Sequence, residues 1–267
     1  MRQENKFIYL VIVAITVFFF SCTKSISDDA LVKFEKRSFS KSFDSTNSKT
    51  ENYVHVKIDY VEFTEAKLPA VKDSLNNKVY RYINTPVFEN NTKSLEELSL
   101  ALIADYKSHK KEFPESPAVY ELERKVEVIN STLEYVSIRF SEYSFLGGAH
   151  PNSVMLFSNI DLRTGKEIKL HDLFVDGYLA ELNKIGESYF KKERGLHSDD
   201  DLEKVGFWFN ENKFAVNNNF AISSDYLIFY FNDYEIAPHA IGPTEFKIPI
   251  KELKAIIKPG SFIKTNE

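Results

Sequence analysis

Residues 120–160 have the sequence YELERKVEVINSTLEYVSIRFSEYSFLGGAHPNSVMLFSNI, and this stretch decides the fold class. Apolar and polar residues alternate over 120–128, 136–140 and 154–160. A period of two is typical of half-buried strands. Asn130-Ser131 supplies turn residues after the first strand, and Gly147–Pro151 breaks the chain before the third. The stretch therefore predicts three consecutive antiparallel strands.

Further elements are predicted on both sides of this meander. Strands with the same alternation are predicted over 54–60 and 246–250, and the apolar run 226–231 is also predicted to be a strand. Helices with an apolar face are predicted over 71–83, 95–106 and 178–189. Ser94 and Glu97 form a capping-box pattern at the start of the second helix. Because helices interrupt groups of strands, we predict an α+β fold of antiparallel sheets with packed helices.

The expected organisation is two α+β subdomains, at 51–145 and 146–258, with a tail at 259–267. Asp161–Gly165 has the residues of a hairpin turn, and Ile168 and Leu170 are expected to start the returning strand. A short helix is expected from residue 249 or 250 to about 257.

The amino-terminal sequence predicts export and a lipid anchor. Arg2 and Lys6 precede the apolar stretch 7–20, which is shorter than the roughly 20 residues of a membrane span. Ser21 and Cys22 follow, so we expect a lipoprotein signal peptide at 1–21 and acylation of Cys22. A tether at 22–50, with room for one docked strand, then leads to the folded part. The predicted location is the cell envelope, attached to a bacterial membrane.

The net charge and the cysteine content limit which molecules and metal ions the protein is expected to bind. The formal net charge is −5, and cleavage after Ser21 removes Arg2, Lys6 and Glu4 and leaves −6. An acidic chain is a poor nucleic-acid binder and favours a cationic partner. Cys22 is the only cysteine, so its acylation excludes disulfides and thiolate metal sites.

Catalytic motifs are missing from the sequence. It has no His-Glu-x-x-His, no nucleophile elbow and no glycine-rich phosphate loop, so we expect no enzyme activity, no cofactor and no metal. His150 and His239 lie in proline-containing bends that could meet in space. With Glu235 or Asp172 they would form a metal site or an acid–base pair; alternatively, each histidine caps a turn.

Two irregular loops are candidate binding sites. Gly147–Pro151 has two glycines that allow a positive φ, and His150 is held extended by Pro151. The bend at 234–243 is stiffened by prolines, which lowers the entropy cost of binding. The alternative for both loops is a simple connection between strands. The candidate binding residues are Gly147, Gly148, His150, Pro151, Tyr234, Glu235, Pro238, His239 and Gly242.

Several motifs occur in a familiar order. They are Gly147–Pro151, Asp161–Lys166, Leu170-His171-Asp172-Leu173-Phe174, Tyr234–Pro238, Ile248-Pro249 and Glu252-Leu253. The chain resembles, over about 53–257, the extracellular domain of RsiV-like anti-sigma factors, which also lies beside the catalytic domain of PdaC-like peptidoglycan deacetylases. The resemblance is most specific from Gly147 onward.

The resemblance implies a module that binds rather than catalyses, because RsiV-like sensors capture lysozyme. We expect neither a sigma-binding region nor a deacetylase domain here. The predicted function is a lipid-anchored envelope module that captures a cationic lysozyme-like protein or a peptidoglycan fragment. Two alternatives stay open: a structural or assembly lipoprotein that binds another envelope protein, and a metal-assisted envelope hydrolase.

Overall fold

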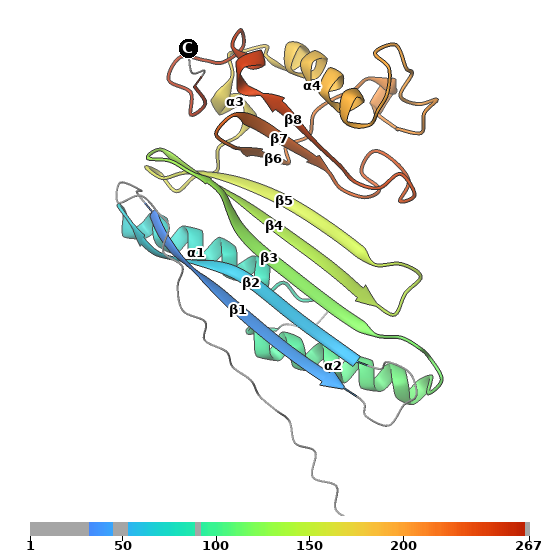
Figure 1. The fold of residues 1–267 in the computed structure, drawn as a ribbon. Helices are drawn as coiled ribbons and strands as arrows, with labels where there is room; N and C mark the ends of the chain where they lie inside the picture. Colours follow the sequence, from blue (N-terminus) through green and yellow to red (C-terminus); the bar gives the residue numbers. More distant parts are fainter. Residues whose placement is uncertain (1–31, 45–52, 89–91, 265–267) are drawn as a thin grey trace, which may run out of the picture.

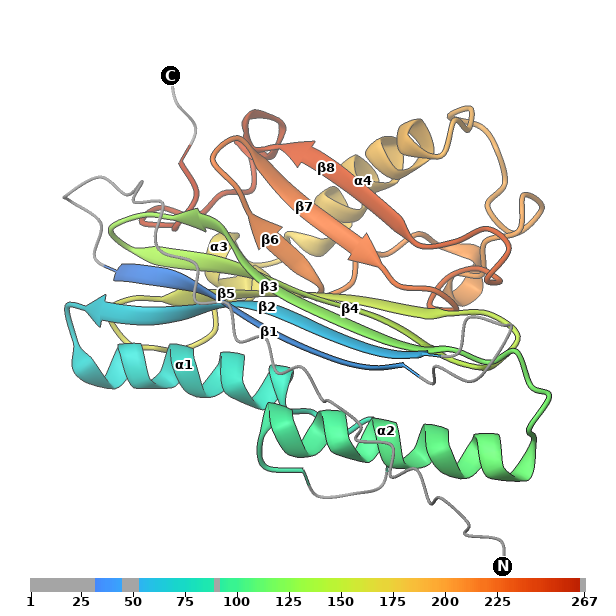
Figure 2. The same ribbon diagram turned by 60° about the horizontal axis from the view of Figure 1, so that its bottom comes forward.

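A computed structural model describes residues 32–44, 53–88 and 92–264. Helices α1 and α2 cover one face of a large sheet, and a smaller sheet with α4 lies over the other face (Figures 1 and 2). The predicted α+β fold is confirmed. The predicted signal peptide and Cys22 lie outside the described residues. Among the described residues, no helix is long and apolar enough to cross a membrane.

The large sheet has the strand order β1-β2-β3-β4-β5. Its strands are β1 (Val32–Asp44), β2 (Tyr53–Ala66), β3 (Tyr120–Ser131), β4 (Tyr135–Leu146) and β5 (Asn152–Asp161). Strands β3, β4 and β5 form the predicted meander. Strand β1 is the one docked strand for which the sequence left room before residue 50.

The large sheet is mixed, which differs from the antiparallel sheets expected. Strand β2 pairs with β3 in parallel. The connection between them contains α1 (Pro69–Ile83) and α2 (Leu95–Glu112). A parallel pair needs such a crossover, because the chain must return to the same end of the sheet. Ser94 caps α2 by accepting a hydrogen bond from the backbone N–H of Glu97 at 3.1 Å, as its sequence predicts.

The second unit is built around a three-stranded antiparallel sheet of order β6-β7-β8. Its elements are α3 (Leu170–Leu173), α4 (Leu179–Glu193), the 3-10 helix η1 (Asn210–Asn212), β6 (Phe220–Ile222), β7 (Tyr226–Phe231), β8 (Thr244–Pro249) and the 3-10 helix η2 (Ile250–Leu253). Phe190 of α4 packs against Phe231 and Phe246 of the sheet, with ring centroids 6.0 Å apart in each pair. A separate apolar core fills the space between α1, α2 and the large sheet.

The large sheet extends past the boundary expected between residues 145 and 146, because β5 (Asn152–Asp161) pairs with β4. The returning strand expected at Ile168 and Leu170 is wrong. Only a single bridge joins Ile160 to Glu167, and Leu170 begins α3. The physical reason is that side chains of the second unit occupy the edge of β5, as described below.

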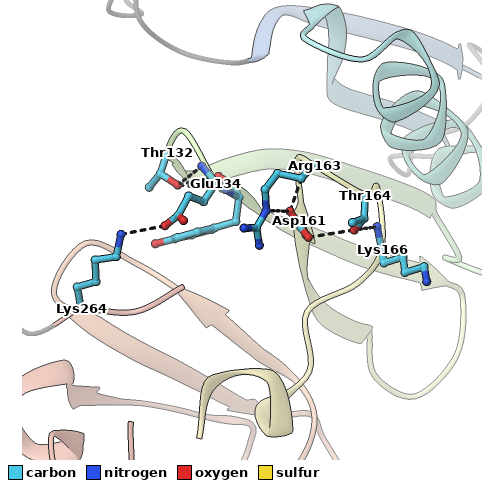
Figure 3. A network of polar contacts seen from close by, with 8 residues as sticks. Thr132, Glu134, Asp161, Arg163, Thr164, Lys166 and Lys264 are labelled. Carbon is cyan, nitrogen blue, oxygen red and sulfur yellow. Dashed lines mark hydrogen bonds and ion pairs between the residues drawn. The ribbon is translucent and has the colours of Figure 1, made fainter. Parts of the chain in front are cut away.

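The turn that follows β5 is held by Asp161 (Figure 3). Its carboxylate accepts hydrogen bonds from the backbone and side chain of Arg163 and from the Thr164 hydroxyl. Burial alone raises the pKa of Asp161, but these hydrogen bonds outweigh it and lower the pKa. Nearby, Lys264 reaches Glu134 at 3.1 Å and ties the end of the described chain to the large sheet.

Glu167 is a second anchor beside this turn. Burial alone raises its pKa, but a hydrogen bond from Lys169, the charge of Lys78 and a hydrogen bond from Ser158 outweigh that effect. Together they lower the pKa of Glu167 to about 2. The ionised carboxylate therefore links α1, β5 and the segment that leads into the second unit.

Candidate acid–base site

The second unit is joined to the large sheet by asparagine side chains along the free edge of β5. Asn232 accepts a hydrogen bond from Met155 N at 2.7 Å and donates one to Met155 O at 3.1 Å. Asn219 accepts from Phe157 N at 2.8 Å and donates to Met155 O at 2.9 Å. These amides satisfy backbone groups that an edge strand otherwise leaves unpaired. Asn232 thereby places the start of the β7–β8 connection beside β5.

The β4–β5 connection lies at the same end of the molecule as the β7–β8 connection (Figures 1 and 2). Gly147 adopts a φ of +73°, and a Cβ added there would lie 2.8 Å from the Cβ of Ala118. Glycine is therefore required at this position. Gly148 has open space around it, so the predicted need for two special glycines applies only to the first. His150 follows, exposed at the tip.

The β7–β8 connection carries a strained tyrosine. Tyr234 has a φ of +63°, in the left-handed region that disfavours a bulky side chain. Its side chain is also largely exposed, at 56%. Strain of this kind persists only where the surrounding structure enforces it, and it occurs often at functional sites. Glu235 helps enforce it by accepting a hydrogen bond from the backbone N–H of Asn232 at 2.9 Å.

The two connections bring three aromatic rings together. His150 stacks on His239 with ring centroids 4.3 Å apart and an angle of 22° between the planes. Tyr234 stacks on His239 at 5.6 Å and 17°. The Tyr234 hydroxyl also lies 3.4 Å from His150 Nε2. We call His150, Asp233, Tyr234 and His239 the junction cluster, because they join the large sheet to the second unit.

Hydrogen bonds assign the proton on His150. Its Nδ1 lies 3.1 Å from the carbonyl oxygen of Pro151, which only accepts, so Nδ1 carries the proton. In the neutral ring, Nε2 is then free to accept the hydroxyl proton of Tyr234. The Tyr234 hydroxyl is thus oriented from outside its own loop.

Asp233 provides the carboxylate of the cluster. Its Oδ2 lies 3.5 Å from His239 Nδ1, and only 10% of the Asp233 side chain is exposed. The His239 Nδ1 atom is buried and makes no hydrogen bond within the described residues, whereas 37% of the side chain is exposed. Nε2 is not among the buried unpartnered atoms of the described residues, so it is the ring nitrogen open to solvent. An aspartate behind a histidine whose outer nitrogen faces solvent is an arrangement suited to acid–base chemistry.

Sequence reasoning identified both histidines and Tyr234 but named the wrong carboxylate. Glu235 is directed to Asn232 and Asn217, and Asp172 lies beside His171 at 3.6 Å and caps α3. The only sequence signal for Asp233 is its place next to Tyr234.

The other predicted positions shape the two loops. Pro151 accepts from His150, Pro238 accepts from Ile241 N, and the N–H of Gly242 donates to His239 O. Gly242 has a φ of +77°, which closes the bend.

The stacked arrangement does not resemble a metal centre. Facing rings direct their nitrogens sideways instead of toward a common point. Among the described residues, no three histidine, cysteine, aspartate or glutamate side chains gather as metal ligands would. The metal-ligand form of the His150–His239 hypothesis therefore finds no supporting group of side chains in the described part of the chain.

Two family models match successive parts of the chain. Residues 47–153 match the family described as deacetylase PdaC, and residues 171–251 match the protein family of unknown function DUF3298. The first part of the chain is therefore similar to the PdaC family and the second part to DUF3298. His150 lies in the first match, and Asp233, Tyr234 and His239 lie in the second, so the junction cluster combines residues of both.

Two curated proteins are similar in sequence. The peptidoglycan-N-acetylmuramic acid deacetylase PdaC of Bacillus subtilis is 27% identical over 190 residues, which are 68% of this chain and 40% of that protein. Esterase Rv3036c of Mycobacterium tuberculosis is 30% identical over 115 residues, 42% of this chain and 48% of that protein. The chain thus spans less than half the length of either relative. Both names denote enzymes and point to enzymatic activity, so the prediction of a non-enzymatic protein is corrected.

Two solved structures share the fold. A DUF3298-family protein of Bacteroides fragilis has a TM-score of 0.65 and 20% identity, covering 87% of this chain and 96% of the other. A DUF3298-family protein of Pseudomonas aeruginosa has a TM-score of 0.58 and 23% identity, covering 85% and 95%. At these identities the likeness concerns the fold alone. The similarity to PdaC, and not the shared fold, relates the chain to a protein that acts on the cell wall.

Proposed function

We propose that this protein is a cell-envelope hydrolase that removes acyl groups at the junction cluster. The observation that carries the proposal is the Asp233–His239 pair, with the buried carboxylate behind the ring and Nε2 on the exposed side. The names of the relatives support it, since a deacetylase and an esterase both cleave a bond to an acyl carbon. Sites of this kind form often where two structural units meet.

The proposed reaction uses water as the nucleophile. In the proposed reaction the 3.5 Å contact between Asp233 and His239 closes to a hydrogen bond when substrate binds, which keeps the proton of His239 on Nδ1. Nε2 then takes a proton from water as the oxygen attacks the acyl carbon. The Tyr234 hydroxyl turns from its long, 3.4 Å contact with His150 Nε2 and donates its hydrogen bond to the developing oxyanion. The intermediate then collapses, the leaving oxygen or nitrogen takes the proton back from His239, and the free acid departs.

The test measures release of acetate from acetylated wall glycan and hydrolysis of a small acyl ester by the purified chain. We expect H239N to lower kcat/KM about 100- to 10,000-fold, the usual contribution of a general base. H171N is the matched control, because His171 also lies beside an aspartate, at 3.6 Å, but away from the cluster. Equal rates for H239N and wild type, or equal losses in H239N and H171N, would contradict the assignment.

A second candidate function is capture of a cationic, lysozyme-like protein by the same surface. The net charge of −5 and the exposed Tyr234 and Trp208 favour it, because opposite charge speeds encounter and exposed aromatics anchor interfaces. Calorimetric titration with a panel of lysozymes at two salt concentrations tests this function. Absence of heat, with another envelope protein co-purifying, would favour an assembly role instead.

The proposal includes an envelope location with a lipid anchor at Cys22. Each methylene buried in a membrane contributes about 0.8 kcal/mol, so two or more acyl chains give stable attachment. Membrane fractionation of wild type and C22A tests the anchor. Release of C22A into the soluble fraction is expected, and equal membrane retention of both proteins would contradict acylation of Cys22.

A further inference from the structure

Trp208 lies next to the junction cluster with half of its side chain in solvent. Its neighbours in the chain, Phe207 and Phe209, turn inward and pack on Phe190 with ring centroids 5.0 Å and 5.7 Å away. Trp208 is 49% exposed. The Phe-Trp-Phe sequence buries Phe207 fully and Phe209 partly, and leaves half of the largest side chain of the three in water. The packing of the core does not explain that placement.

Hydrogen bonds fix Trp208 against the loop that carries Tyr234. The backbone N–H of Trp208 donates to Ile236 O at 2.9 Å, and its indole Nε1–H donates to Glu235 O at 3.3 Å. Gly206 has a φ of +96°, and a Cβ there would lie 2.9 Å from Ile241 Cδ1. The indole is therefore held in place before any ligand arrives, which lowers the entropy cost of binding.

The surface around Trp208 combines exposed rings with polar groups. Tyr234 is 56% exposed and directly precedes Glu235, whose carbonyl oxygen accepts the hydrogen bond from the indole. The Glu235 carboxylate borders the same loop and is held by the Asn217 side chain at 2.7 Å. A pyranose ring has an apolar C–H face and a rim of hydroxyl groups. Flat aromatic faces bordered by hydrogen-bonding groups match that chemistry.

We propose that Trp208 is a sugar-stacking subsite, so that the acyl group hydrolysed at the junction cluster is carried on a pyranose glycan. A sugar unit lies on the indole and directs the acyl group of its neighbour toward His239. The inference rests on the proposed function, because it names the substrate class of that site. Trp208 is a specificity-determining residue and takes no part in proton transfer.

The chain contains one tryptophan, which makes the test direct. Intrinsic fluorescence of the full chain is titrated with N-acetylglucosamine oligosaccharides, with glycerol as a polyol control. We expect a saturable change in intensity or wavelength with the oligosaccharides alone. A flat titration, or the same change with glycerol, overturns the subsite.

Kinetics then separate the subsite from the catalytic group. We expect W208A to raise the ratio of KM for an acetylated oligosaccharide to KM for a small acyl ester at least tenfold. W208F, which keeps an aromatic face, should restore much of that ratio. Y226A is the control, because Tyr226 is an exposed aromatic, 42%, at the opposite end of β7 from the cluster.

The outcomes distinguish the two proposals. Saturable fluorescence without acyl release by wild type supports the subsite and overturns hydrolysis. Acyl release with an unchanged KM ratio in W208A supports hydrolysis and overturns the subsite. A loss in W208A that is equal for both substrates also overturns the subsite, because it shows that the indole acts only by holding the loop.

Discussion

Asn232 is the residue whose replacement best tests how the two units are joined. N232A removes the acceptor for Met155 N and the donor to Met155 O, at 2.7 Å and 3.1 Å. Each such hydrogen bond contributes about 0.5–1.5 kcal/mol net. Met155 O still accepts from Asn219 at 2.9 Å, so the main loss is the unpaired Met155 N–H. We therefore expect N232A to lower the free energy of unfolding by about 2 kcal/mol.

Urea denaturation followed by circular dichroism measures this loss, with an unchanged slope as the sign that the unfolded state is unaffected. N232D keeps the acceptor for Met155 N and loses only the donor to Met155 O, which Asn219 still serves, so a loss well below that of N232A is expected. N152A is the control, because Asn152 is an exposed asparagine of β5, the strand that Asn232 contacts. Its free energy of unfolding should stay within about 0.5 kcal/mol of the wild-type value. N232A should also lose at least tenfold in acyl hydrolysis, because Asp233 and Tyr234 follow directly. If N232A lost no more stability than N152A, the conclusion that Asn232 joins the second unit to the edge of β5 would be wrong.

Three further changes test the local geometry. Y234G relieves a left-handed backbone conformation that costs a non-glycine residue about 1–2 kcal/mol. Thermal unfolding should therefore show equal or higher stability, while acyl hydrolysis falls at least tenfold. A clear destabilisation would contradict the backbone strain at Tyr234. G147A should lower the free energy of unfolding by about 1–2 kcal/mol, since φ is +73° there. G148A should have little effect on it. Equal losses in the two variants would contradict the special role of Gly147. Because the pKa of Glu167 is lowered from 4.5 to about 2, its ionised form stabilises the fold above pH 4.5, and that contribution is lost as the pH falls toward 2. We expect about 1 kcal/mol, since a third of the side chain is in water; E167Q should flatten this part of an acid titration, and an unchanged profile would contradict the ion pairing.

Sequence periodicity predicted much of the secondary structure. The alternation at 54–60 lies within β2, and Ser94 caps α2 as its capping pattern indicates. Such patterns work because the side-chain period of each element is local, and burial of one face leaves a record in consecutive residues. The same patterns did not show that β2 and β3 pair in parallel, since alternation says which face is buried and not which strand lies alongside.

The candidate site shows the same division. Sequence alone marked the two stiff loops and the histidines within them, because glycine and proline restrict the backbone wherever they occur. The sequence could not reveal that Asp233, and not Glu235 or Asp172, faces His239, nor that Trp208 binds the carbonyl of Glu235. Those two contacts depend on how the second unit folds, and His150 reaches His239 only because Asn219 and Asn232 bind the edge of β5. The local sequence determined the stiffness of the two loops. The docking of the second unit on the large sheet decided that His150 meets His239 and Tyr234, because only packing in three dimensions brings residues so far apart in sequence into contact.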